Sequence, residues 1–125
     1  MSDTICIVVP PRNNMSKVVH LATTAVASRA GLNIDQADDL NTGLDELFRM
    51  SVASDHGGDS FCVRYEIHSD RLEVTAEGID PGLVDDSSKV SRYRKFILEK
   101  VADRFEQQAN QTGDLDILLV KFIKS

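Results

Sequence analysis

The sequence contains no tryptophan, and phenylalanine and tyrosine make up only 6% of its 125 residues. Its two cysteines, Cys6 and Cys62, lie in strand-like runs without a neighbouring cysteine or histidine, so we expect small buried thiols in place of a disulfide. No apolar run approaches the roughly 20 residues of a membrane span, and the first residues lack a basic region followed by an apolar one. We therefore expect a cytoplasmic protein without membrane contact.

The common catalytic and metal motifs are missing as well. The three histidines, His20, His56 and His68, are far apart and form neither H-E-x-x-H nor a Cys-x-x-Cys pattern, so we expect no metal site. No G-x-S-x-G elbow and no Walker-type loop is present, and the Gly57-Gly58 pair lacks the context of a dinucleotide fingerprint. These absences exclude the corresponding classes of enzyme.

The composition is that of one globular domain over residues 1–125, with 42% hydrophobic and 27% charged residues. The net charge of −6 argues against nucleic acid as the main partner. Residues 35–46 hold five acids and no base, whereas residues 89–104 hold six bases and two acids. Opposite patches of this kind suit docking onto a protein of complementary charge.

The N-terminal half of the sequence predicts one strand followed by two helices. A β-branched alternation over residues 5–9 indicates the strand. Apolar residues then recur at three- and four-residue steps from 15 to 30, and Gly31 supplies a helix stop. Asp35 is the expected cap of the second helix. The apolar stripe of this helix consists of Leu40, Leu44, Leu47, Phe48 and Val52.

The C-terminal half predicts a hairpin over residues 61–76, a third helix and a last strand over 115–123. The stripe assigned to the third helix is Val90, Tyr93, Ile97, Val101 and Phe105. The resulting order, β-α-α-β-β-α-β, predicts an α/β two-layer sandwich in which the three long helices cover one face of a mostly antiparallel sheet. The residues expected together in one core are Leu44, Phe48, Val74, Ile97 and Leu119.

The segment 38–50, DDLNTGLDELFRM, resembles the helix that carries the E-x-x-x-N motif in the histidine-kinase-like (GHKL) ATPase superfamily. The resemblance is closest to the bacterial anti-sigma-factor serine kinases, in which an acidic pair leads into an apolar helix, as Asp38-Asp39 does here. It continues back through residues 27–32 and Val9-Pro10, and forward to the last strand. The resemblance covers nearly the whole chain and implies the histidine-kinase-like ATPase fold.

The resemblance places Glu46 on the general base that, in this family, takes a proton from the serine attacking the γ-phosphate of ATP. Met50 falls on the magnesium-binding asparagine, and a thioether lacks the hard oxygen that magnesium prefers. Ala76 replaces the carboxylate that reads adenine. Gly78 keeps its identity, but Asp80 stands in place of the second glycine of the same motif and adds a negative charge beside the expected phosphates.

The remaining nucleotide motifs are altered in the same direction. Asp116 replaces a threonine of the last strand, where Lys121 is kept. The segment 87–95, at the position of the glycine-rich lid, contains no glycine. We therefore expect no cofactor, with ATP and magnesium bound only if the family activity is retained. Without phosphates to order it, the stretch 80–88 is expected to be mobile or irregular.

These features predict a divergent anti-sigma-type domain that has lost kinase activity and binds a sigma factor, an anti-anti-sigma (STAS-type) protein, or both. The family often forms homodimers and contacts partners through its first helix, which nominates Lys17, His20 and Thr24. His20 falls where family members often carry an arginine. Two alternatives stay open: an active serine/threonine protein kinase that uses Glu46 as base, and a dimerising scaffold or sensor domain without nucleotide.

Overall fold

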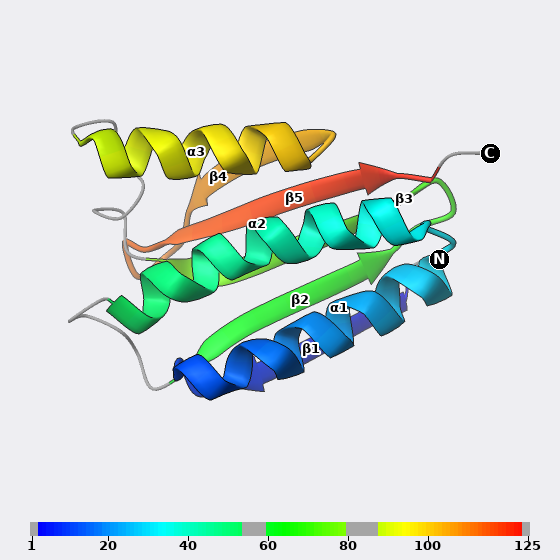
Figure 1. Cartoon of the computed structure of the whole chain (residues 1–125), viewed down its shortest axis with the longest axis horizontal. Helices are drawn as coiled ribbons and strands as arrows, with labels where there is room; N and C mark the ends of the chain where they lie inside the picture. Colours follow the sequence, from blue (N-terminus) through cyan, green and yellow to red (C-terminus); the bar gives the residue numbers. More distant parts are fainter. Residues whose placement is uncertain (1–2, 54–59, 80–87, 124–125) are drawn as a thin grey trace.

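The computed structural model describes residues 3–53, 60–79 and 88–123. They form a five-stranded sheet of order β1-β2-β3-β5-β4 in which every neighbouring pair is antiparallel. The three long helices cover one face of this sheet (Figure 1), which confirms the predicted two-layer sandwich. The elements are β1 (Asp3–Val9), the short 3-10 helix η1 (Asn13–Met15), α1 (Ser16–Ala30), α2 (Ile34–Ala53), β2 (Phe61–Ile67), β3 (Arg71–Ile79), α3 (Lys89–Val101), β4 (Arg104–Ala109) and β5 (Leu115–Phe122).

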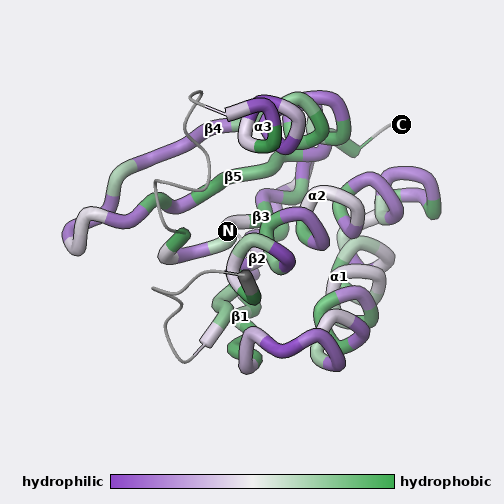
Figure 2. Tube along the Cα trace, turned by 60° about the vertical axis from the view of Figure 1, so that its left-hand side comes forward, coloured by the Kyte–Doolittle hydropathy of each residue, from purple (hydrophilic) through white to green (hydrophobic). Residues whose placement is uncertain are grey.

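The hydrophobic core lies between the helices and the sheet. Figure 2 shows α1 and α2 side by side on one side of the strands. Leu44, Phe48, Val74 and Leu119 are all buried in this core, as predicted. The rings of Phe48 in α2 and Phe61 in β2 meet edge to face with centroids 5.2 Å apart, an arrangement that aromatic pairs favour. The apolar stripe of α2 therefore binds that helix to the middle of the sheet.

The apolar stripe predicted for α3 was wrong. Its first two members, Val90 and Tyr93, are exposed. Ile97 is only half-buried and does not belong to the core, whereas Leu98 is fully buried. The helix ends at Val101, because Ala102 is extended, and Phe105 lies in the strand β4, which pairs with β5. This strand forms an edge of the sheet and has the mostly polar sequence RFEQQA. Because its apolar and polar residues do not alternate clearly, the sequence did not predict a strand here.

The N-terminus of α2 is capped by a residue that sequence reasoning missed. The side chain of Asn33 accepts a hydrogen bond from the Gln36 backbone N–H (2.8 Å), and the Gln36 side chain accepts one from the Asn33 N–H (3.1 Å). This reciprocal pair is a capping box, and Asp35 lies inside the first turn. Gln36 Nε2 also donates to the Phe122 carbonyl (2.8 Å), which ties the start of α2 to the end of β5.

The cysteines are not the buried thiols that we expected. Cys6 in β1 is exposed, Cys62 in β2 is half-buried, and both are free. Alternate residues of a strand point to opposite faces, and Val63 and Phe61, the neighbours of Cys62, are buried toward the helices. Both cysteines therefore lie on the face of the sheet that the helices leave uncovered.

Gly43 allows α2 to approach its neighbours closely. A Cβ atom at this position would lie 2.9 Å from Leu119 Cδ1 and 3.2 Å from Val101 Cγ2, so a larger residue would force β5 or α3 outward.

In the described part of the chain, no helix has the length and apolar character needed to cross a membrane. The segment 80–87, for which we predicted mobility, lies outside the described residues, and Ser88 caps α3 by accepting a hydrogen bond from the Ser91 N–H.

Candidate functional site

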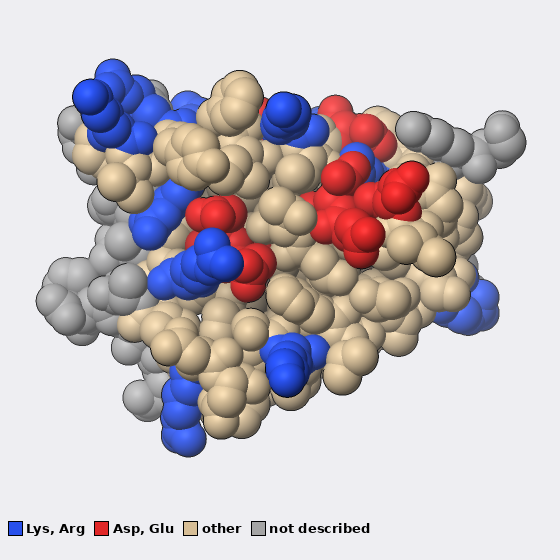
Figure 3. Space-filling view, in the orientation of Figure 1, with Lys and Arg blue, Asp and Glu red and all other residues tan. Residues whose placement is uncertain are grey.

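An open hollow of about 390 Å³ lies between α1 and α2. Only His20 comes from α1, and the remaining lining residues come from α2. Figure 3 shows acidic side chains gathered over α2 on this face of the molecule. The hollow thus joins the predicted catalytic residue Glu46 to the predicted partner-contact residue His20. Its lining consists of His20, Asp38, Asn41, Thr42, Asp45, Glu46 and Arg49.

Charged groups of both signs are paired within this hollow. Arg49 contacts Asp45 Oδ2 at 2.9 Å and Glu46 Oε1 at 3.4 Å. His20 Nε2 lies 3.5 Å from Asp45 Oδ1, and Arg94 Nε of α3 lies 4.0 Å from Glu46 Oε2. The Glu46 side chain is only 15% exposed, and both of its oxygens face a guanidinium group. Both carboxylate oxygens of Glu46 therefore take part in ion pairs with neighbouring arginines.

The three residues nominated for partner contact lie along one side of α1. Lys17 and Thr24 are exposed, and His20 between them is half-buried against α2. Thr24 Oγ1 accepts a hydrogen bond from Asn41 Nδ2 at 3.1 Å, so its position is set by α2. Leu21, on the same stretch of the helix, is 73% exposed. We call these residues together with Leu21 the α1 face; it combines a large apolar side chain with polar groups of defined position.

Two of the expected nucleotide-pocket residues belong to the hydrophobic core. Met50 in α2 and Ala76 in β3 are both fully buried, with 0% exposure. Ala76 lies between Val63 of β2 and Ile117 of β5 in the sheet, and all three are core residues. Met50 and Ala76, the residues expected at the magnesium-binding and adenine-reading positions, therefore pack between the helix layer and the sheet.

Gly78 and Asp116 lie together at one end of the sheet. Gly78 has a positive φ of 72°, which a glycine adopts without strain, at an irregularity in the β3–β5 register. Its backbone N–H donates to Asp116 Oδ1 at 3.1 Å, and Asn110 Nδ2 donates to the same oxygen at 3.3 Å. Both residues line a second open hollow of about 540 Å³ together with residues of the β4–β5 connection.

Lys121 lies apart from both the core residues Met50 and Ala76 and the hollow at Gly78, in an ion pair with two aspartates. Its side chain is 9% exposed, and Nζ contacts Asp39 Oδ2 at 2.9 Å and Asp103 Oδ1 at 3.7 Å. Asp80 lies outside the described residues. Within the described ranges, the expected nucleotide-pocket residues are therefore distributed over the core, the hollow at Gly78 and this ion pair.

Sequence reasoning selected His20 and Glu46 but missed Asp45 and Arg49, the pair that connects them. The i,i+4 spacing of an acid before a base was the available signal, since such residues are neighbours on a helix surface. That spacing is common on exposed helices, and only the packing of α1 against α2 shows that His20 completes the group.

A five-stranded antiparallel sheet with helices on one face defines the class of fold, an α/β two-layer sandwich. The chain is similar to the crystal structure of the RsbU and RsbW domains of Rv1364c from Mycobacterium tuberculosis, with a TM-score of 0.68 and 12% sequence identity. The similarity covers 96% of this chain and 32% of that chain. At this identity the likeness shows the fold alone. No family model and no curated protein matches the sequence.

Proposed function

We propose that the chain is an anti-sigma-factor-like regulatory domain of the cytoplasm that acts by binding another protein and has no ATP-dependent kinase activity. One observation carries this proposal: Met50, at the position of the magnesium ligand in the resembling family, is a fully buried core residue. A thioether in an apolar core supplies no hard oxygen ligand for magnesium. Phosphoryl transfer depends on a held metal to neutralise developing charge, so this loss removes the main electrostatic clamp.

The α1 face is the surface that we assign to the partner. An exposed large apolar side chain beside positioned polar groups is typical of a protein-binding surface, because burial of the apolar group drives association and the polar groups give specificity. Leu21 supplies the exposed apolar side chain, and the neighbouring His20–Asp45–Arg49 group supplies the positioned polar groups. The acids around this hollow suit a partner that presents a basic side chain to it. A sigma factor or a STAS-type anti-anti-sigma protein is the partner class that the resemblance implies.

The test measures binding of the full chain to purified sigma factors and STAS-type proteins of the source bacterium by calorimetry. Leu21→Asp places a charge in the expected contact and should weaken binding at least about tenfold, as loss of a buried apolar anchor does at other interfaces. Val90→Asp is the matched control, because Val90 is 57% exposed on α3 and away from α1. Equal binding by both variants would remove the α1 face from the interface.

The rival function is that of an active serine/threonine protein kinase, and the observation in its favour is the position of Glu46 in an open hollow. Transfer of labelled γ-phosphate from ATP to a bound STAS-type protein would establish it and contradict our proposal. A dimeric chain that binds neither class of partner would instead support the scaffold alternative. Sedimentation of the chain alone and with each candidate partner distinguishes these outcomes.

A further inference from the structure

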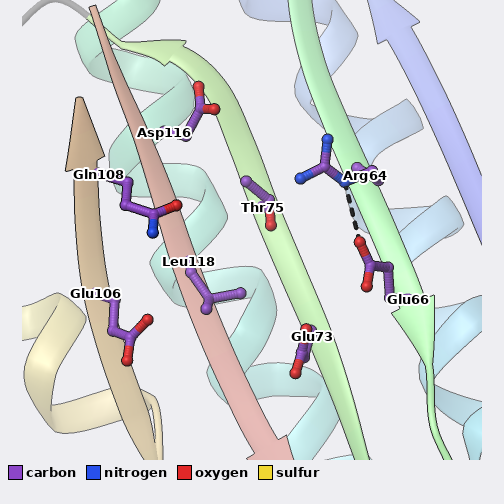
Figure 4. A pocket seen from close by; sticks show the side chains of 8 residues that line it. All are labelled: Arg64, Glu66, Glu73, Thr75, Glu106, Gln108, Asp116 and Leu118. Atoms are coloured by element: carbon purple, nitrogen blue, oxygen red, sulfur yellow. Dashed lines mark ion pairs between the residues drawn. The ribbon is translucent and has the colours of Figure 1, made fainter. Parts of the chain in front are cut away.

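The uncovered face of the sheet carries a cluster of one histidine and two glutamates. Glu66 in β2 lies directly opposite Glu73 in β3, and His68, two residues after Glu66, projects to the same face. One ligand atom from each of these three residues lies within 4.8 Å of the other two. Figure 4 shows Glu66 and Glu73 on their neighbouring strands, beside the hollow on this face. We call Glu66, His68 and Glu73 the open-face cluster.

The imidazole of His68 lacks a hydrogen bond at the atom that faces both glutamates. Nε2 is buried and has no hydrogen-bond partner among the described residues. It lies 3.6 Å from Glu66 Oε2 and 3.5 Å from Glu73 Oε1. A charge-assisted hydrogen bond from an imidazolium to one carboxylate would be about 2.7–2.9 Å long. Two equally long separations indicate instead that the three atoms surround a space between them.

These separations match the spacing of ligands around a tetrahedral metal ion. Bonds of roughly 2.0–2.1 Å at the tetrahedral angle place two ligand atoms about 3.3–3.5 Å apart. Both distances from His68 Nε2 are close to this value. One imidazole and two carboxylates form a ligand set that zinc and related divalent ions accept, with water in the remaining position. The third separation, between the two carboxylate oxygens, is at most 4.8 Å.

An arginine lies beside each carboxylate of the open-face cluster. Arg64 Nε lies 3.2 Å from Glu66 Oε1, and Arg71 Nε lies 2.7 Å from Glu73 Oε2. Arg71 donates a hydrogen bond to Glu73, whereas Arg64 donates its hydrogen bond to Glu77 and lies beside Glu66 as an ion pair. In each glutamate, the other oxygen is turned toward His68. Groups that fix the orientation of metal ligands in this way raise metal affinity in known sites, since the ligands lose less freedom on binding.

We propose that Glu66, His68 and Glu73 bind one divalent transition metal ion of the zinc class. The ion joins β2 to β3 beside the turn at Ser69-Asp70 and therefore stabilises this hairpin. None of the three ligands lines the hollow between α1 and α2, so the site is independent of the partner surface assigned above. The sequence did not reveal it, because Glu66 in β2, His68 just after β2 and Glu73 in β3 are brought together only by the pairing of the two strands.

The test uses the full chain without a histidine tag, stripped of metal with a chelator. Titration with zinc by calorimetry should give one ion per chain, and cobalt(II) should give the visible absorption of a tetrahedral site. Zinc should also raise Tm, because a ligand that binds only the folded state stabilises it. His68→Ala and Glu66→Gln should each weaken zinc binding by about tenfold or more, as changes at metal sites do.

Glu106→Gln is the matched control, since Glu106 is a carboxylate on the same face of the sheet but outside the cluster. It should leave zinc affinity unchanged. Circular dichroism establishes that each variant is folded. If His68→Ala is unstable, Glu66→Gln still tests the site, because glutamine preserves the size of the glutamate side chain. Absence of zinc binding at micromolar concentration would overturn the proposal, and so would zinc binding that survives both His68→Ala and Glu66→Gln.

Discussion

The phenol oxygen of Tyr65 in β2 lies 2.7 Å from the hydroxyl of Thr23 in α1, and both side chains are fully buried. This hydrogen bond joins the helix layer to the sheet inside the hydrophobic core. Either oxygen can be the donor. A buried hydroxyl without a partner costs about 1–3 kcal/mol, so each group makes burial of the other possible.

We predict that Thr23→Val destabilises the chain by about 1–2 kcal/mol, because the shape is kept while the Tyr65 hydroxyl loses its partner. Tyr65→Phe should cost less, since a threonine hydroxyl in a helix can turn to a carbonyl of the preceding turn. The double variant should cost less than the sum of the two single changes. Urea unfolding of all four proteins measures the coupling, and strict additivity would show that the contact contributes nothing.

Stability should also fall at alkaline pH. Burial raises the pKa of Tyr65 above its ordinary value of 10.0, and the hydrogen bond to Thr23 offsets only part of this shift. Above that pH the unfolded chain releases the phenol proton while the folded chain retains it, so stability is full below about pH 10 and is lost as pH rises further. Tyr65→Phe should flatten this dependence. Tyr93→Phe, which changes an exposed tyrosine, is the control and should keep the decline.

The ion pair of Lys121 gives a third prediction. Asp39→Asn removes its nearer carboxylate and should destabilise the chain by about 1 kcal/mol, because a nearly buried ammonium is left with Asp103 at 3.7 Å. Lys121→Met should be close to neutral, since an apolar side chain of similar length removes the charge itself. Thermal unfolding compares the two. A larger loss for Lys121→Met than for Asp39→Asn would contradict this account, and Asp38→Asn serves as a control on the same helix.

The fourth prediction concerns ATP. Titration of the chain with ATP and magnesium to millimolar concentration should show no binding, because Met50 and Ala76 lack the polar atoms that the resembling family uses. The triple variant Met50→Asn, Ala76→Asp, Asp80→Gly should recover binding at least in part. Micromolar binding of ATP by the unchanged chain would contradict the proposed loss of kinase activity. It would support Glu46 as the general base of an active kinase.

The same variants carry a stability cost that must be measured first. Met50→Asn places an amide in a fully buried position and should cost about 2–5 kcal/mol. Met50→Leu is the matched control, since it conserves apolar volume, should cost less than about 1.5 kcal/mol, and should bind no ATP. Circular dichroism establishes which variants are folded before the nucleotide titration.

Much of the fold could be predicted from the spacing of apolar residues, but the polar elements could not. The stripes of α1 and α2 and the alternation over 61–76 identified these elements, because burial of one face imposes a period on the sequence. The edge strand β4 was missed because its residues are mostly polar and partly exposed. For α3, two apolar residues in succession, Ile97 and Leu98, left the buried face ambiguous by one position.

The sequence by itself determined the order of most elements, because apolar periodicity is a local property. It also determined that Met50 and Ala76 offer no oxygen ligand or carboxylate, because the type of a side chain is local as well. Only the tertiary structure decided which polar side chains meet. His20 reaches Asp45 through the packing of two helices, and His68 stands between two glutamates through the register of two strands. Such contacts depend on how elements distant in the chain are placed against one another, and no local pattern encodes that placement.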